Sequence, residues 1–341
     1  MDTLYLSKKK KISINGYLDS YFTYDFNQPK SRSIPYFVSA ANHNHFSINL
    51  SYLDLKYTNT RFRARFIPGF GSYMKANYTN EKGFMKNIVE ASVGICLSKK
   101  RNIWLEYGIL SSPFTNETAI SKDHFMYTRS LAPEYVPYYL TGIKASIPLT
   151  SKWNLYTYIL NGWQQISDQN NTKSFATQLE YRPNVLNVLN WNTYVGDERS
   201  HLSPTFRMRY FSDFYWIYSP NKKWNLITCI YGGWQKFSNQ KHAFWWQANV
   251  SGKWNFSKKQ NLAGRIEYFY DPQNCMITNL LKNEKISIFS AGICYNVNIQ
   301  KHVLFRVDAR QFYTQKPMFT NQFSSHTNNA FVLTGNMTVW F

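Results

Sequence analysis

The sequence is poor in cysteine and in acidic residues, and it contains no long apolar run. Its four cysteines, at positions 96, 229, 275 and 294, form no CxxC pair, which excludes the usual zinc-binding spacings and a disulfide framework. No run approaches the roughly 18 apolar residues that a membrane-spanning helix needs. Residues 1–10 also lack the apolar core of a secretory signal. The chain is therefore expected to be either cytoplasmic or a mature form whose signal has been removed.

Basic and aromatic residues are abundant instead. The chain has 39 Lys and Arg against 19 Asp and Glu, a net charge of +20, and 18% of its residues are aromatic. Such an aromatic content excludes a disordered chain. The basic residues gather in short segments such as 99–101, 222–223 and 258–259, and no nucleic-acid-binding motif accompanies them. The sequence therefore favours solvated turns over binding of nucleic acid.

Alternation of apolar and polar residues dominates the chain. Phe62, Ala64 and Phe66, for example, alternate with arginines, and a period of two predicts β-strands. A phase slip between Leu50 and Leu53 predicts a bulge. About sixteen strands are expected, at residues 11–26, 45–58, 61–76, 87–98, 102–111, 137–149, 152–163, 173–182, 188–197, 204–217, 223–234, 243–255, 260–270, 286–297, 302–313 and 329–341.

Long and short connections alternate between these stretches. Long ones include 27–44, 77–86, 112–136, 271–285 and 314–328, and short ones include 59–60, 99–101, 150–151, 218–222, 256–259 and 298–301. Outer-membrane barrels combine long extracellular loops, short periplasmic turns and an even strand number. We therefore predict an all-β fold, a transmembrane antiparallel β-barrel of about 16 strands over residues 11–341, preceded by a periplasmic tail at residues 1–10. A soluble sandwich shows the same alternation, but the aromatic content is high for a surface that faces water.

A repeated segment indicates two aromatic belts. Lys-Trp-Asn-Leu occurs at 152–155 and at 223–226, and Gly-Trp-Gln follows each copy at the same spacing, at 162–164 and 233–235. Aromatic residues at both ends of a strand are typical of the two membrane interfaces. On the lipid side, we expect Trp153, Trp224, Trp254 and Tyr181 near the periplasmic rim and Trp163, Trp234, Trp216 and Tyr24 toward the outer rim.

Several segments resemble the OmpL-like β-barrel porins of Gram-negative bacteria. They lie at residues 16–21, 107–114, 127–131, 137–142, 265–271 and 305–308, in an order that extends the resemblance over about residues 11–341. The resemblance implies an outer-membrane porin that is monomeric or self-associating. It bears on fold and location more than on the solute.

Charged residues on the inward face are the candidates for lining a pore. We predict this role for Arg61, Arg63, Arg65, Arg207, Arg209, Arg265, Arg306, Arg310, Glu180, Glu267, Asp213 and Asp308. Rings of arginine favour anions, but the same residues also suit ion pairing across strands, so both interpretations stay open. The longest connection, 112–136, is expected either to fold inward and constrict the pore or to form an external lid or partner-binding loop.

The sequence thus predicts an outer-membrane porin, a passive diffusion channel for small hydrophilic solutes. The alternative is a structural subunit of a larger outer-membrane complex with a blocked lumen, because large aromatics such as Tyr156 and Tyr215 point inward. No catalytic grouping is visible, so no enzyme, metal or cofactor is expected. Expected partners are outer-membrane lipid, lipopolysaccharide, further copies or subunits, and the barrel-assembly machinery, for which the terminal Phe341 resembles a recognition signal.

Overall fold

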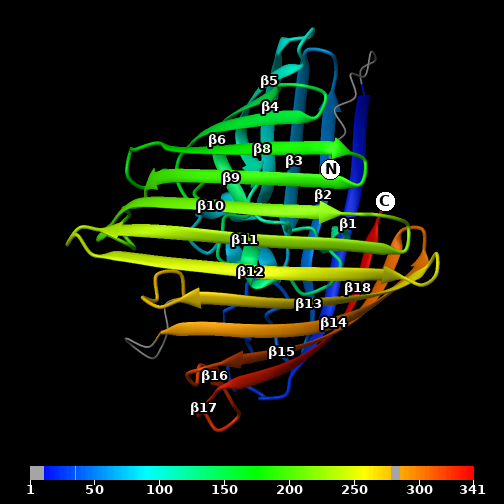
Figure 1. The fold of residues 1–341 in the computed structure, drawn as a ribbon, viewed down its shortest axis with the longest axis vertical. Coiled ribbons are helices and arrows are strands. Elements are labelled where there is room, and N and C mark those ends of the chain that lie inside the picture. The colour runs from blue at the N-terminus through cyan, green and yellow to red at the C-terminus, as the bar shows by residue number, and fades with distance from the viewer. Residues whose placement is uncertain (1–10, 35, 278–284) are drawn as a thin grey trace.

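The computed structural model describes residues 11–34, 36–277 and 285–341, and these form one closed antiparallel barrel. Strands that follow one another in the chain pair side by side, and β18, red in Figure 1, returns beside the blue β1 to close the sheet. The predicted tail at residues 1–10 lies outside the described residues. Among the described residues, no helix is both long and apolar enough to cross a membrane.

The barrel has sixteen strands, as predicted. They are β1 (Lys11–Asp25), β2 (Phe46–Thr58), β3 (Phe62–Phe70), β4 (Ile88–Ser98), β5 (Ile103–Ser111), β6 (Tyr139–Pro148), β7 (Trp153–Leu160), β8 (Ser174–Asn184), β9 (Asn187–Asp197), β10 (Phe206–Tyr218), β11 (Trp224–Phe237), β12 (His242–Asn255), β13 (Gln260–Asp271), β14 (Ile286–Gln300), β15 (Val303–Thr314) and β18 (Asn329–Trp340). Two short strands, β16 (Phe319–Thr320) and β17 (His326–Thr327), pair in the loop before β18.

Two local predictions need comment. The strand expected at 61–76 ends at Phe70, and helix α1 (Ser72–Asn77) follows it. Gly71 breaks the strand, because its φ of +138° suits glycine and a Cβ there would lie 2.3 Å from the Asn49 carbonyl oxygen. The expected bulge is present, one residue before the predicted interval: Asp19 pairs with Leu50 and Ser20 with Ile48, which leaves Asn49 as the extra residue.

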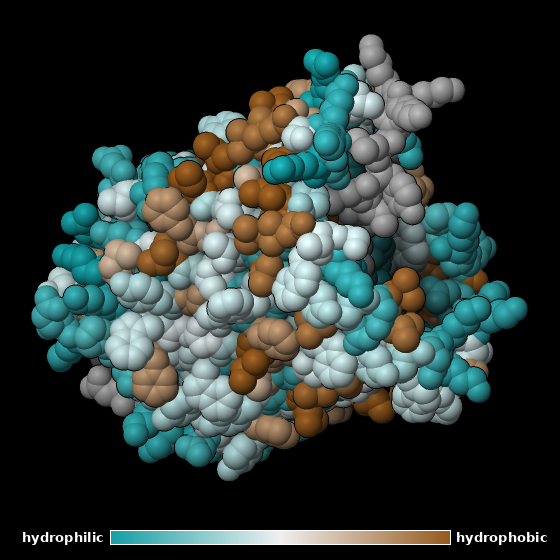
Figure 2. Space-filling model, turned by 45° about the horizontal axis from the view of Figure 1, so that its top comes forward, coloured by the Kyte–Doolittle hydropathy of each residue, from teal (hydrophilic) through white to brown (hydrophobic). Residues whose placement is uncertain are grey.

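Strand polarity gives the barrel two different rims. The short-turn rim contains the connections at 59–61, 99–102, 149–152, 185–186, 219–223, 256–259 and 301–302, and the long-loop rim contains the others. Hydrophilic residues gather at the ends of the strands, and hydrophobic and aromatic residues occupy the band between them (Figure 2). Exposed outward side chains such as Ile14, Val93 and Phe289 belong to this band, as expected for a surface in contact with lipid.

The aromatic belts are confirmed at six of the eight predicted positions. At the short-turn rim, Trp153 stacks on Tyr181 and Trp224 on Trp254. At the long-loop end, Trp234 and Tyr24 lie near the ends of β11 and β1.

The other two predictions were wrong. Trp163 stacks on Phe114 inside the barrel. Trp216 lies at the short-turn rim, where its indole N–H donates to Asn187 Oδ1 over 2.9 Å.

Candidate pore

The lumen is occupied by the connection between β5 and β6, which we call the plug loop (residues 112–138). It contains a 3-10 turn, η2 (Ser121–Asp123), and a short helix, α2 (Leu131–Glu134). It crosses to the opposite wall, where Thr115 N–H donates to Asp213 Oδ2 on β10 over 2.7 Å and Thr128 N–H donates to Asp308 Oδ2 on β15 over 2.9 Å. Of the two predicted alternatives, the inward fold is therefore confirmed and the external lid is wrong.

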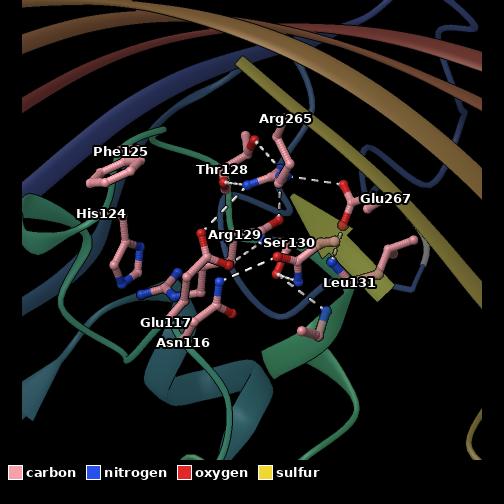
Figure 3. Close-up of polar contacts among 12 residues, drawn as sticks. Asn116, Glu117, His124, Phe125, Thr128, Arg129, Ser130, Leu131, Arg265 and Glu267 are labelled. Atoms are coloured by element: carbon pink, nitrogen blue, oxygen red, sulfur yellow. Dashed lines mark hydrogen bonds and ion pairs between the residues drawn. The ribbon is translucent and has the colours of Figure 1, made fainter. Parts of the chain in front are cut away.

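A buried ionic cluster holds the plug loop at Arg129 and Leu131 (Figure 3). Arg265 Nε and Arg310 Nη2 both bind Glu267 Oε1, over 3.1 and 2.5 Å. Glu267 Oε2 accepts the Leu131 main-chain N–H over 2.5 Å, and Arg310 Nη1 donates to the Arg129 carbonyl oxygen over 2.8 Å. Charge-assisted hydrogen bonds are the strong ones, so this cluster fixes the height of the loop in the barrel.

The segment of the plug loop around Lys122 and Phe125 approaches the short-turn rim. The Lys122 ammonium lies 5.7 Å from the centre of the Trp340 ring, and the Lys253 ammonium lies 4.4 Å from the centre of the Phe125 ring. Trp340 and Lys253 stand near the short-turn ends of β18 and β12. The loop therefore passes through most of the height of the barrel.

Buried side chains line the lumen around the whole circumference. Buried aliphatic and aromatic side chains from several long loops pack together at the long-loop end, among them Leu131, Tyr135, Ile277 and Phe319. Every barrel strand also contributes at least one buried inward side chain. Examples, one from each strand in chain order, are Asp19, Tyr52, Ile67, Glu90, Glu106, Leu140, Tyr158, Ala176, Asn192, Asp213, Cys229, Asn249, Glu267, Ser290, Asp308 and Thr334.

Two titratable groups on the plug loop have shifted pKa values. Burial raises the pKa of Glu134 to about 7, although its carboxylate accepts the Val38 main-chain N–H over 2.8 Å. Burial and nearby arginines, Arg129 first among them, lower the pKa of His124 well below its usual value. His124 Nε2 accepts the Thr118 N–H over 3.1 Å, so the ring is a neutral acceptor in the docked loop.

The twelve candidate pore-lining residues fall into three groups, and their pore-lining role stays a prediction. Near the short-turn rim lie Arg61, Arg63, Arg65 and Glu180, and near the long-loop end lie Arg207 and Arg209. The remaining six hold or adjoin the plug loop: Asp213, Arg265, Glu267, Arg306, Asp308 and Arg310. Sequence reasoning missed Asp19 and Asn249 as contacts of the loop, and only their inward position in the alternation signalled them.

Charged side chains on the wall just inside the short-turn rim form ion pairs. Arg182 binds Glu180 over 2.7 Å. The remaining pairs join β2 to β6 across the wall: Arg63 and Lys144 each to Glu106 Oε2 over 2.7 Å, and Arg65 to Asp54 over 2.9 Å and to Glu90 over 3.1 Å.

Comparison with known proteins identifies the family. Residues 11–341 match the profile of the family described as "Putative beta-barrel porin-2, OmpL-like". The chain belongs to this family. It is thus an outer-membrane diffusion porin, with its short turns on the periplasmic side and its long loops outside. No curated protein matches it in sequence.

Solved porin structures share the fold at low sequence identity. An anion-selective porin from Comamonas acidovorans has a TM-score of 0.66 at 10% identity, with 98% of this chain and 100% of that chain covered. The outer-membrane channel DcaP of Acinetobacter baumannii has a TM-score of 0.66 at 8% identity, with 99% of both chains covered. The trimer form of OmpT from Vibrio cholerae has a TM-score of 0.61 at 9% identity, with 97% and 99% covered.

Proposed function

We propose that this porin passes small anionic solutes in preference to cations and catalyses no reaction. One observation carries the proposal: six of the seven periplasmic turns contain charged residues, and all of these are basic. They contribute Arg61, Lys99, Lys100, Arg101, Lys152, Lys222, Lys223, Lys258, Lys259 and Lys301, and no Asp or Glu. A ring of one sign of charge around a pore mouth raises the local concentration of the opposite ion.

The wall just inside this mouth adds little net charge, because its basic residues are paired with carboxylates. Arg63 and Lys144 share the single carboxylate of Glu106, whereas Arg65 contacts two carboxylates. The inner wall is therefore close to neutral, and the excess positive charge belongs to the rim. The Comamonas porin, which shares the fold, is anion-selective, and this agrees with the assignment.

Reversal potentials across a salt gradient test the preference. We expect modest anion selectivity at 0.01 M salt and little at 1 M, because the Debye length falls from about 30 Å to about 3 Å. Replacing Arg61, Arg63 and Arg65 with Gln should shift selectivity toward cations, since it removes rim charge and takes the arginine partner from Asp54 and Glu90, while Glu106 keeps Lys144. Removing three basic residues of the long-loop rim, Lys173, Arg199 and Lys241, is the matched control and should change it less. Cation preference in the parent, or an unchanged triple arginine variant, would contradict the proposal.

We also propose that copies of the chain associate through the outward face of β1–β5. Exposed Trp side chains, which anchor a barrel at the membrane interfaces, lie on other strands: Trp153, Trp191, Trp224, Trp234, Trp246 and Trp254. The β1–β5 face instead has an apolar groove of about 650 Å³ whose lining includes Ile12, Ile14, Leu55, Phe66 and Val93. The trimer of Vibrio OmpT is a precedent within this fold.

Native mass spectrometry of the detergent-solubilised porin tests the association. We expect an oligomer, and we expect Ile14→Lys together with Val93→Lys to convert it to monomer. The control is Val250→Lys on β12, another exposed outward residue, which should leave the oligomer intact. A monomeric parent, or dissociation by Val250→Lys alone, would count against this interface.

A further inference from the structure

The tip of the plug loop, residues 115–130, fills the lumen of a protein whose function is diffusion. We propose that this plug tip withdraws from the wall to open the channel, and that the wall it covers then lines the water path. The inference rests on the diffusion function and is independent of the ion preference. It also explains how five candidate pore-lining residues face the lumen and are nevertheless buried: Asp213, Arg265, Arg306, Asp308 and Arg310.

The wall beneath the plug tip is suited to water. It includes seven charged and amide side chains that contact the tip: Asp19, Asp213, Asn249, Arg265, Asn296, Arg306 and Asp308. Such groups are hydrated at little cost once the tip leaves. The tip also has apolar contacts, since Met126 and Tyr127 belong to a small buried cluster. The base is packed more extensively, because Leu131, Tyr135 and Val136 belong to the large apolar cluster. The base therefore stays packed, and the tip is the part that moves.

The docked tip leaves several polar atoms without partners. Asn116 Oδ1, His124 Nδ1 and Tyr127 Oη on the tip, and Asp308 Oδ1 on the wall, are buried and make no hydrogen bond within the described part of the chain. Buried polar atoms without partners destabilise a structure. Withdrawal of the tip gives all four atoms access to solvent, so it removes a cost that the docked state carries.

Two native cysteines lie directly beneath the plug tip. The Cys229 thiol on β11 is within hydrogen-bonding reach of the Asn116 main chain, and the Cys294 thiol on β14 is within reach of the Tyr127 main chain. Both side chains are buried. A third buried thiol, Cys275, shares an apolar cluster with Cys229 but lies in the outer loop between β13 and β14. Cys229 and Cys294 therefore report exposure of the covered wall, and Cys275 is a matched control.

Thiol labelling during conduction tests the inference. Three proteins keep Cys229, Cys294 or Cys275 alone, with serine at the other three cysteine positions, and each is reconstituted in a planar bilayer. A water-soluble methanethiosulfonate reagent should modify Cys229 and Cys294 at least tenfold faster than Cys275, and each modification should reduce the current at least twofold. Equal protection of all three thiols in a conducting barrel overturns the proposal, and so does modification without loss of current.

A reversible disulfide between the plug tip and the wall provides a second test. Asn116→Cys, combined with the native Cys229, places a second thiol on the tip opposite the wall. Oxidation should abolish the current and dithiothreitol should restore it, whereas a cross-linked protein that still conducts contradicts the inference. A folded barrel that carries no current although Cys229 and Cys294 are rapidly modified supports withdrawal of the tip and instead contradicts the diffusion function.

Discussion

At the scale of single residues, charges on the barrel wall satisfy the main chain of an irregular loop. The plug loop has few main-chain partners of its own, and buried N–H and C=O groups need them. Wall carboxylates supply acceptors, as Asp213 does for Thr115, and guanidinium groups supply donors, as Arg306 does for the Ser121 carbonyl oxygen over 2.7 Å. Because a buried charge also costs desolvation, these contacts fix the position of the loop more than they stabilise it.

His124 makes the docking of the plug tip sensitive to acid. The groups that act on it are Arg129, Arg306 and Arg265, which disfavour its charged form, and Asp123, which favours it. Its pKa is lowered in the docked tip and returns toward about 6.5 when the tip is solvated. The stability that it contributes is therefore complete above about pH 6.5 and is lost as the pH falls below that value toward the docked pKa.

Single-channel recording at pH 7 and pH 5 measures this effect. Acidification should raise the open fraction more in the parent than in His124→Asn, because only the parent loses docked-state stability through this ring. The barrel wall is the same in both proteins, so any contribution it makes cancels in the comparison. His201→Asn, at an exposed position in an outer loop, is the control and should respond as the parent does. The same pH response in parent and His124→Asn would refute the role of His124.

At the scale of elements, the sequence predicted strands better than their ends. The alternation around Phe244, Trp246 and Gln247 predicted a strand at 243–255, and β12 spans His242–Asn255. A period of two is a local property, and it fixes which side chains point inward. The end of a strand depends also on its neighbours. β11 continues past Trp234 because β10 and β12 still pair with it there: Gln235 pairs with Arg209 and with Ala243.

The first copy of the repeated segment shows the limit of this reasoning. β7 ends at Leu160, and Gly162, with a φ of +153°, turns the chain inward, so that Trp163 packs inside the barrel. The contacts between the plug loop and the barrel wall were likewise not predictable from the sequence. The inward face of Arg306 follows from alternation, but its partner Ser121 lies 185 residues away in a loop without any period. Contacts of that range depend on the closed fold.

At the scale of the whole molecule, the barrel depends on the seam between its first and last strands. β1 pairs with β18 from Tyr17 with Trp340 to Asp25 with Val332, which removes both open edges. Phe341 extends the seam: its N–H donates to the Gly16 carbonyl oxygen over 3.1 Å, and its own carbonyl oxygen accepts the Gly16 N–H over 3.3 Å. Its ring covers Gly16, where a Cβ would lie 2.1 Å from the ring.

Deleting Phe341 separates assembly from stability. The deletion removes two hydrogen bonds of about 1 kcal/mol each, which is little against the nine residue pairs from Tyr17 to Asp25 that hold the rest of the seam. The refolded variant should therefore unfold at nearly the parental urea concentration. Its yield in the outer membrane should fall severalfold, because an open barrel edge persists until the last strand is recognised and paired. Phe341→Tyr, which keeps the ring, should retain most of the yield. Equal outer-membrane yields of the deletion and the parent would show that the terminal aromatic is only part of the seam.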